Sequence, residues 1–336
     1  MFYKTLIRPI LFRFDAERAH HFALHAATIL ARRRWLADRI HSFVAPSCEP
    51  TTVAGISFPN RIGLAGGMDK NAVAPRAWWA FGFGFIELGT ITPKPQAGND
   101  KPRMFRIPKD RAVRNRMGFN NDGAEVVAAR LAELTTSGLR PPFPIGISVG
   151  KNKDTPAESA ADDYALAASR LAPHADFITI NVSSPNTPGL RAFQDVDSLK
   201  PLIRATKAVI AGKPLFVKFA PELTGDPLAA VVDGCLEEGC QGIIATNTMA
   251  QFDAAGKPIG GLSGKPLKEI SPLRVAEIRK RMGDGPALIG CGGIDDVASA
   301  RRMIDSGANL IQLYTALVYE GPFLAARLAR GLSRSS

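Results

Sequence analysis

The sequence has few cysteines and none of the patterns that cysteine-based folds require. Four cysteines, Cys48, Cys235, Cys240 and Cys291, occur in 336 residues, and no two of them form a CxxC pair. A disulfide scaffold and a zinc ribbon are therefore not expected, because both need closely spaced cysteines. The sequence also has no run of 18 apolar residues, which argues against a membrane-spanning helix. An export signal is not expected either, because no short apolar core followed by a small-residue cleavage site opens the chain.

What is present is a globular composition with an uneven distribution of positive charge. Hydrophobic residues make up 46% and charged residues 22%, and the formal net charge is +11. Residues 1–45 carry eight Lys or Arg against three acids, interleaved with large apolar residues at approximately helical spacing. Such an amphipathic segment either lies on an anionic membrane surface or packs its apolar face on the rest of the protein. Nucleic-acid binding is disfavoured, because aromatic stacking platforms and a binding motif are absent.

The remainder of the chain reads as eight strand–helix units. Helix-compatible stretches such as 157–171, 198–210, 227–238 and 297–306 alternate with short apolar runs. This alternation predicts parallel strands in a (β/α)8 barrel of the α/β class. A doubly wound open sheet is the main alternative, but it would require a glycine-rich dinucleotide fingerprint that the sequence lacks. The predicted strands are 61–67, 83–91, 144–150, 177–183, 215–220, 242–248, 287–293 and 310–317.

Two segments depart from a plain barrel. Residues 53–60 precede the first strand, and we interpret them as a hairpin that caps the floor of the barrel. Residues 92–123 follow the second strand and hold eight basic residues, which is too long for an ordinary strand-to-helix loop. Loops of this length are usually lids or binding loops.

The polar residues at the ends of the predicted strands indicate the kind of chemistry. In a barrel, the active site lies at the C-terminal ends of the strands. These ends are rich in amides, hydroxyls and lysines, and the acids nearest to them are Asp69 and Glu87. A glycosidase would need two opposed carboxylates, and a hydrolytic metal site would need His, Asp and Glu clusters. His174, the one histidine outside the N-terminal segment, precedes its strand and lies at the wrong end, so we expect no histidine base and no metal.

Glycine-rich turns near the C-terminus predict a phosphate site. GCGG (290–293) and GGLSG (260–264) each precede a helical stretch, where backbone N–H groups can approach an anion. Barrels often hold phosphate with the loops after their last two strands. A phosphate group together with Lys218 in mid-barrel fits FMN, with the lysine near the N1/C2 carbonyl end of the flavin.

The residues now carry a family resemblance over essentially the whole length. The chain resembles the dihydroorotate dehydrogenases, in particular their quinone-linked, membrane-associated class 2. The resemblance rests on GLAGGMDKN (63–71), ELGTITPKPQAGN (87–99), PRMFR (102–106), NRMGFNN (115–121), GKNKDT (150–155), NVSSPNTPGL (181–190), VKFAP (217–221), TNT (246–248), GGLSGKPL (260–267), GCGGI (290–294) and QLYTAL (312–317).

The resemblance implies an FMN enzyme that oxidises (S)-dihydroorotate to orotate in pyrimidine (UMP) biosynthesis. It implies that Ser184, where the soluble class carries cysteine, takes a proton from C5 while hydride passes from C6 to flavin N5. Thr187 and Phe119 match the proton relay of relatives. The implied substrate contacts are Lys70, Asn115, Arg116, Met117, Gly118, Phe119, Asn181, Asn186, Asn247 and Thr248. The implied FMN contacts are Gly66, Gly67, Met68, Asp69, Lys70, Thr90, Asn181, Lys218, Thr246, Gly264, Gly293, Tyr314 and Thr315. Ser148 stands where many relatives have asparagine, which leaves open whether it contacts FMN.

The same resemblance gives the N-terminal segment a role. Residues 1–45 would form two short helices around an apolar mouth at the membrane surface, with His20 and Arg106 facing a ubiquinone-type quinone. Residues 46–336 would form the FMN-binding barrel. The implied protein is a monomer, peripheral on the cytoplasmic side of the cell membrane. Two alternatives remain at this point: a phosphosugar isomerase or lyase that shares the phosphate site, and a non-catalytic barrel that serves as a membrane-bound interaction module.

Overall fold

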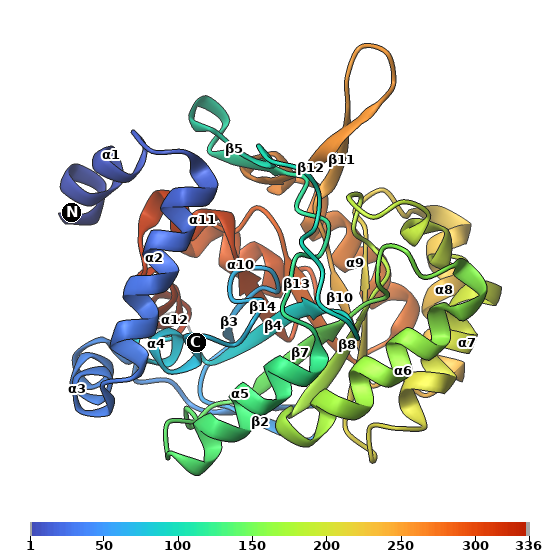
Figure 1. Ribbon diagram of the computed structural model, residues 1–336, viewed down its shortest axis with the longest axis horizontal. Coiled ribbons are helices and arrows are strands. Elements are labelled where there is room, and N and C mark those ends of the chain that lie inside the picture. The colour runs from blue at the N-terminus through green and yellow to red at the C-terminus, as the bar shows by residue number, and fades with distance from the viewer. Residues whose placement is uncertain (1, 334–336) are drawn as a thin grey trace.

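The centre of the molecule is a closed barrel of eight parallel strands, which confirms the predicted fold (Figure 1). The computed structural model describes residues 2–333, so Met1 and residues 334–336 of the two predicted segments lie outside it. Around the barrel the strands follow the order β10-β13-β14-β3-β4-β7-β8-β9. Their side chains are buried at nearly every position, as expected for a parallel sheet covered by helices. The strands are β3 (Ile62–Leu64), β4 (Phe85–Ile91), β7 (Ile145–Val149), β8 (Phe177–Asn181), β9 (Leu215–Phe219), β10 (Gly242–Ala245), β13 (Ala287–Cys291) and β14 (Leu310–Leu313).

Helices follow the strands and form the outer ring. Each of the four helical stretches predicted from the sequence is present, with ends shifted by at most a few residues. Asp296 begins α10 with a reciprocal capping box to Ser299, which explains why that helix starts where the sequence indicates. The helices of the ring are α4 (Pro75–Ala80), α5 (Ala124–Thr136), α6 (Ala160–Leu171), α7 (Val196–Lys207), α8 (Gly225–Glu237), α9 (Ile270–Met282), α10 (Val297–Asp305), α11 (Thr315–Glu320) and α12 (Leu324–Ser333). Single 3-10 turns occupy Pro108–Asp110, Ala157–Ser159, Ala172–His174, Leu190–Phe193 and Lys265–Leu267.

The predicted hairpin closes the floor of the barrel. Strands β1 (Thr51–Val53) and β2 (Ile56–Phe58) pair antiparallel. The ring of Phe58 is 1% exposed and meets the ring of Phe85 edge-on at 5.2 Å, next to other aromatic side chains at the N-terminal strand ends. The floor is therefore sealed by aromatic packing, and ligands must enter from the opposite end.

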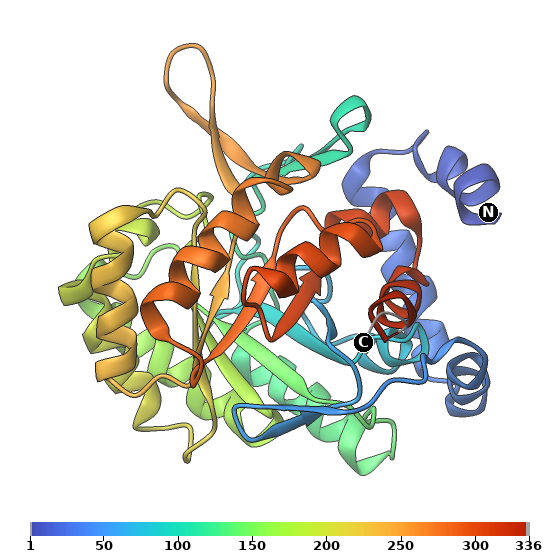
Figure 2. The same cartoon turned by 180° about the vertical axis from the view of Figure 1, so that it is seen from behind.

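A four-stranded antiparallel sheet rises above the mouth of the barrel. Its order is β11 (Met249–Phe252), β12 (Pro258–Gly264), β6 (Ala112–Asn115) and β5 (Met104–Ile107), and the β11–β12 hairpin projects outward (Figures 1 and 2). The long segment 92–123 is thus partly strand. The interpretation of GGLSG as a glycine turn is wrong, because these residues form the end of β12. Pairing with β6, far away in the sequence, supplies the hydrogen bonds that make this glycine-rich stretch a strand.

The N-terminal segment contains three α-helices and a π-helical turn, instead of the two short helices expected. These are η1 (Tyr3–Ile7), α1 (Arg8–Leu11), α2 (Ala16–Ala31) and α3 (Arg34–Val44), which lie along one side of the barrel beside α4, α11 and α12 (Figure 2). Alanines of α2 pack against alanines at α4, at positions 27, 31, 74 and 77. Within residues 2–333 no helix combines the length and apolar character needed to cross a membrane.

The two faces of the N-terminal segment differ in the size of their apolar side chains. The face toward the barrel uses mainly small residues, whereas large apolar side chains point outward. The exposed large side chains are Phe2, Leu6, Ile7, Ile10, Phe14, Phe22, Ile29, Trp35 and Phe43. Exposed large apolar residues on a basic amphipathic segment are typical of an interaction surface, so packing on the barrel does not account for the whole amphipathic pattern.

Candidate active site

A cavity opens at the C-terminal ends of the barrel strands, and we call it the mouth cavity. It holds about 1170 Å³ of space free of protein atoms, part of it open to solvent. Most residues predicted for the site line this cavity, although they come from seven of the eight strand ends and from the sheet above them. Those residues are Gly66, Gly67, Lys70, Thr90, Asn115, Met117, Gly118, Phe119, Asn181, Ser184, Asn186, Lys218, Thr246, Asn247, Thr248, Gly264, Gly293, Tyr314 and Thr315.

Four predicted site residues lie outside the lining of the mouth cavity. Met68 faces the N-terminal helices instead. Asp69 is buried, and its carboxylate accepts hydrogen bonds from two backbone amides of the following turn and from an indole N–H. Arg116 is exposed and donates to the carbonyl of Pro102 at 2.9 and 3.1 Å. Thr187 is buried, and its hydroxyl has no hydrogen-bond partner among residues 2–333. Asp69 and Arg116 thus have side-chain roles in local structure.

Amides and hydroxyls form a connected network on the floor of the mouth cavity. Asn181 at the end of β8 donates to the hydroxyl of Thr90 at 2.7 Å, and Thr90 lies 2.9 Å from the hydroxyl of Ser148. Asn247 donates to the hydroxyl of Ser183 at 2.9 Å and to Oδ1 of Asn181 at 3.3 Å. Neighbouring strands bring these groups together, so their orientation is fixed before any ligand binds. Such preorganised donors are what a developing negative charge needs.

Ser184 lies where the loop after β8 meets strand β6. Its hydroxyl accepts a hydrogen bond from the backbone N–H of Asn186 at 3.3 Å and is only 6% exposed as a residue. The side chain of Asn186 donates to Oδ1 of Asn115 at 3.1 Å, while its own Oδ1 is buried without a partner among the described residues. Phe119 lines the same wall and has a positive φ of 53°, an uncommon conformation for a bulky residue. An unpartnered acceptor in a cavity wall indicates a place for a hydrogen-bonding ligand.

Lys218 is held in the barrel by a buried ion pair. Its Nζ lies 3.0 Å from Oε2 of Glu87 and 3.5 Å from Oε1 of Gln312. Burial acts to lower the pKa of Lys218, but the attraction of Glu87 outweighs burial and the pKa is raised. Lys218 therefore stays protonated. Oε1 of Glu87 and Nε2 of Gln312 have no partner among residues 2–333, so one acceptor and one donor remain free beside this cation.

Glycines and hydroxyls form the opposite end of the mouth cavity. Gly293 follows β13 with a φ of +74°, and a Cβ there would meet the backbone of Lys268 at 2.3 Å. Gly264 has a φ of +96°, and a Cβ would meet the carbonyl of residue 111 at 2.4 Å. Thr315, the first residue of α11, donates from its hydroxyl to Ser263 at 2.7 Å. Glycine is required at both positions because neighbouring backbone lies this close, and glycine turns that line a cavity let backbone N–H groups approach an anion.

Lys70 stands alone at the entrance between β3 and the N-terminal helices. It lines the mouth cavity and makes no hydrogen bond or ion pair with the side chains that the structure describes. Burial, with a smaller contribution from Arg103, lowers its pKa to about 8. An unpaired lysine at this position is poised to receive an anionic ligand group.

A second cavity lies between the N-terminal helices and α11, and we call it the apolar cavity. It holds about 1910 Å³ of space free of protein atoms, and alanine, phenylalanine and other apolar side chains dominate its wall. His20 and Arg106 both line it, as does Tyr314, which also lines the mouth cavity. Burial lowers the pKa of His20 to about 3, so this histidine is neutral at physiological pH. Arg106 donates to the carbonyl of Leu11 at 3.0 Å and to that of Phe14.

Sequence reasoning missed several residues of the mouth cavity. Gln312 occupies an inward-facing position of β14, which strand alternation could have revealed. Arg111 was one of eight basic residues in a segment whose fold was not foreseen. Its φ of +47° places its backbone in the left-handed region, which is uncommon for a residue other than glycine. Lys265 and Asp295 flank the two glycine stretches. Residues 2–333 contain no group of three or more His, Cys, Asp or Glu side chains able to hold a metal ion.

Comparisons with known proteins identify the family of the chain and agree with its fold. The family model of dihydroorotate dehydrogenase matches residues 49–335. A dihydroorotate dehydrogenase (quinone) of Chloroflexus aurantiacus is 44% identical, with 99% of this chain and 96% of the relative covered. A dihydroorotate dehydrogenase (quinone) of Nocardioides sp. is 45% identical, with 98% of this chain and 97% of the relative covered. The crystal structure of an Eimeria tenella dihydroorotate dehydrogenase in complex with ferulenol has a TM-score of 0.82 and 36% identity, covering 95% of this chain and 90% of that one. With its barrel, its cavity and its full-length relatives in agreement, the chain belongs to the dihydroorotate dehydrogenase family.

Proposed function

We propose that the protein oxidises dihydroorotate to orotate with FMN as its cofactor and a membrane quinone as the final electron acceptor, in pyrimidine biosynthesis. One observation carries the proposal: Tyr314 lines both the mouth cavity, whose wall carries amides, hydroxyls and lysines, and the apolar cavity. A water-soluble substrate and a lipid-soluble acceptor need such chemically different sites. The relatives named as quinone-linked enzymes support the same conclusion.

The residues of the mouth cavity fit FMN. Gly264, Gly293 and Thr315 would hold the phosphate group, because backbone N–H groups are accessible there. Lys218 would face the electron-accepting end of the flavin, near the free donor of Gln312 and the free acceptor of Glu87. Thr90 and Asn181 would bind the ring edges, with the hydroxyl of Ser148 beside them. When bound, FMN supplies a two-electron acceptor whose N5 takes up hydride.

The amides of the upper wall would bind dihydroorotate. Asn115, Asn186 and Asn247 offer donors and acceptors that match an imide ring, and Lys70 offers a cation to the substrate carboxylate. As negative charge develops on the C4 carbonyl during proton removal, fixed amide donors stabilise it more than they stabilise the resting substrate. Preorganised donors of this kind are each worth about 3 kcal/mol of barrier.

Ser184 would remove the proton from C5 while hydride leaves C6. A serine hydroxyl is a weak base, so its own proton must move on as it accepts the substrate proton. The unpartnered buried hydroxyl of Thr187 is available for this transfer, and Phe119 would shield the path from bulk water. Ser184 is thus the proposed catalytic base, with the hydroxyl of Thr187 as its relay toward solvent and Phe119 as a residue that lines this path.

The apolar cavity would admit the quinone from a membrane surface. His20 and Arg106 would face the quinone head, and neutral His20 suits an uncharged ligand. The exposed large apolar side chains of the N-terminal segment would rest in the lipid surface, with its arginines near anionic head groups. The protein would then be peripheral, on the cytoplasmic side of the cell membrane, and would need no partner subunit.

A visible absorption spectrum tests the proposal. The purified protein is expected to be yellow, and dihydroorotate added without oxygen should bleach the flavin absorbance. Addition of a short-chain ubiquinone should then restore the colour. A colourless protein that isomerises or cleaves a phosphosugar would contradict the proposal, as would a flavin that dihydroorotate leaves unchanged.

A further inference from the structure

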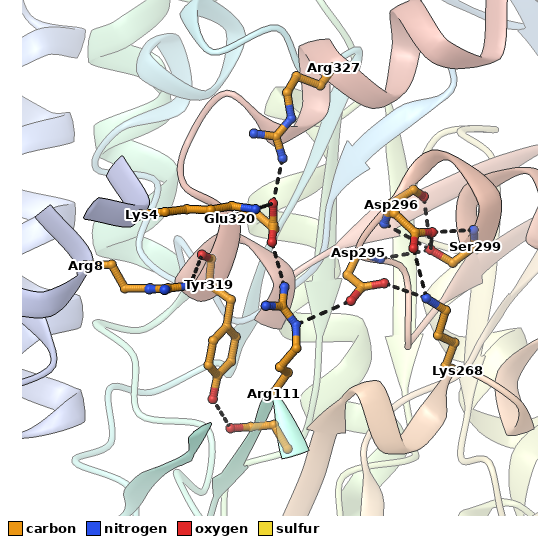
Figure 3. Close-up of polar contacts among 11 residues, drawn as sticks. Lys4, Arg8, Arg111, Lys268, Asp295, Asp296, Ser299, Tyr319, Glu320 and Arg327 are labelled. Atoms are coloured by element: carbon orange, nitrogen blue, oxygen red, sulfur yellow. Dashed lines mark hydrogen bonds and ion pairs between the residues drawn. The ribbon is translucent and has the colours of Figure 1, made fainter. Parts of the chain in front are cut away.

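The side chain of Glu320, at the end of α11, is surrounded by three cations (Figure 3). Its Oε2 lies 2.7 Å from Lys4 and 2.9 Å from Arg327, and its Oε1 lies 2.6 Å from Arg111. The side chain of Glu320 is only 8% exposed, whereas that of Lys4 is 44% exposed. Burial acts to raise the pKa of Glu320, but Lys4 and Arg111 outweigh burial and the pKa is lowered. We call these four residues the Glu320 cluster.

The turn that carries Glu320 is also where the N-terminal segment is attached. Tyr3 donates its hydroxyl hydrogen to the carbonyl of Val318 at 2.8 Å. Arg8 donates to the carbonyl of Tyr319 at 3.1 Å (Figure 3). Gly321 completes this attachment, since a Cβ at that position would lie 2.6 Å from the ring of Tyr3. Four consecutive residues at the end of α11, 318–321, therefore contact η1 and the start of α1.

The Glu320 cluster lies between the two cavities. Lys4 and Glu320 line the apolar cavity, and Arg111 lines the mouth cavity. Arg111 lies 3.6 Å from Asp295, which Lys268 in turn holds at 2.9 Å (Figure 3). The ion pairs of Arg111 are therefore shared between the cofactor side and the N-terminal side, whereas Lys4 belongs to the N-terminal side alone.

Burial distinguishes this cluster from an ordinary surface ion pair. Exposed pairs contribute little, because water and salt screen them. A buried carboxylate shared by three cations is different, since removing its charge leaves those cations facing one another without compensation. Among residues 2–333, Glu320 is the one ion-pair partner of Lys4, so its charge adds to the hydrogen bonds of Tyr3 and Arg8 in holding this segment.

We propose that Glu320 is a positioning residue for the electron acceptor: it holds η1 and α1 against α11 and so keeps the wall of the apolar cavity closed around the acceptor. The proposal rests on the proposed function, in which the apolar cavity receives the quinone. Glu320 takes no part in oxidation of dihydroorotate, which occurs on the other side of Tyr314. Loss of the carboxylate charge then weakens acceptor binding and leaves the first half-reaction unchanged.

The test uses the full-length, FMN-loaded protein and its Glu320→Gln and Lys4→Met variants. Both variants should raise the KM for a short-chain ubiquinone, by about tenfold for Glu320→Gln, which corresponds to about 1.4 kcal/mol. The rate at which dihydroorotate bleaches the flavin should stay within about twofold of the wild-type rate, a change below about 0.5 kcal/mol. Trypsin should cleave after Arg13 faster than in the wild type, as measured by mass spectrometry.

Three further variants serve as controls. Glu237→Gln removes a carboxylate paired to a lysine at the same 2.7 Å distance on the surface of α8, and it should change neither measurement. Arg327→Met removes an arm of the cluster without touching the N-terminal segment, and it should have a smaller effect than Glu320→Gln. The double variant Lys4→Met/Glu320→Gln should show less than the sum of the two single effects, because both remove one interaction.

Two results would overturn the proposal. The first is wild-type cleavage and wild-type acceptor KM in Glu320→Gln, or in Lys4→Met if Glu320→Gln does not fold. The second is an equal slowing of flavin reduction and of quinone reduction, which would indicate a general structural role. A wild-type protein that reduces no quinone would instead refute the proposed function, together with the acceptor part of this proposal. The protease measurement would still decide whether Glu320 holds the segment.

Discussion

The mouth cavity and the apolar cavity share a side chain but are built in different ways. The mouth cavity takes its walls from strand ends whose spacing the hydrogen-bonded barrel fixes. The apolar cavity takes its walls from α2, α11 and the short η1 and α1, which side-chain packing and ion pairs hold in place. A closed sheet resists small displacements, whereas a helix attached by a few contacts can move. In the proposed reaction, chemistry that needs fixed geometry would thus lie in the barrel, and exchange with a surface would lie outside it.

The polarity of the two cavities follows from the same difference. Strand ends in a barrel present backbone and short polar side chains, and Asn181, Thr90 and Asn247 satisfy one another there. Helices present one face, and α2 turns alanines inward and phenylalanine outward. Substitutions in the mouth cavity should therefore change rates, and substitutions on the N-terminal segment should change access.

The largest expected effect is a loss of reaction rate in the mouth cavity without a loss of stability. Ser184→Ala should lower the rate of flavin bleaching by dihydroorotate by about 10³-fold near pH 7, within the range of a general base. FMN content and thermal stability should stay at wild-type values, because the Ser184 hydroxyl receives one hydrogen bond, from Asn186, and that bond is long. Stopped-flow absorbance measures the rate.

Ser184→Cys is the matched control for this prediction, because a thiol can carry the same proton at a different pKa. It should retain more activity than Ser184→Ala and shift the pH profile. Near-normal bleaching in Ser184→Ala would contradict the assignment of the base and would place the chemistry elsewhere in the mouth cavity.

The second effect concerns the outward face of the N-terminal segment. Replacing Phe22, Trp35 and Phe43 together by serine should weaken binding to vesicles that contain anionic lipid by about 100-fold, given about 1 kcal/mol for each partly buried aromatic ring. Vesicle sedimentation measures this binding, and flavin bleaching by dihydroorotate should be unaffected. Phe252→Ser is the control, since Phe252 is 57% exposed on the distant β11–β12 hairpin. Equal loss in the control would mean that exposed aromatics bind lipid without regard to position.

The smallest effect is a pH dependence that belongs to the mouth cavity alone. Burial lowers the pKa of Lys70 to about 8, so its charge is present below that pH and lost above it. Because the cation is needed for the substrate carboxylate, kcat/KM for dihydroorotate should fall above pH 8, by up to about tenfold per pH unit. Lys70→Arg keeps its positive charge at alkaline pH, so the fall in kcat/KM above pH 8 should become smaller in this variant. An unchanged alkaline limb in Lys70→Arg would assign the pH dependence to another group.

The barrel could be predicted from the sequence because each strand carries its own signal. A run such as residues 83–91 is apolar except for Glu87 and Thr90, and residues 177–183 end in polar side chains where the strand leaves the core. Local composition therefore located the strands, and the rule that sites lie at C-terminal strand ends placed Ser184, Asn181 and Lys218 in one cavity.

The sheet above the barrel could not be predicted in the same way. Strands β6 and β12 are short, half-exposed and basic or glycine-rich, and they become strands by pairing across about 150 residues of sequence. The same applies to the partners of Glu320, which lie at positions 4, 111 and 327. Charge counts over residues 1–45 and 92–123 included Lys4 and Arg111 but not Arg327, and no local pattern encodes which carboxylate these residues meet.

The placement of Tyr314 has one further consequence. Tyr314 lines the mouth cavity, which would hold the water-soluble substrate, and the apolar cavity, which would hold the lipid-soluble acceptor. The reductant and the oxidant can then remain dissolved in immiscible phases throughout turnover, and only electrons and protons need to pass between them. The enzyme would work as a junction between two solvents, so that neither the nucleobase precursor nor the lipid carrier has to leave its own phase.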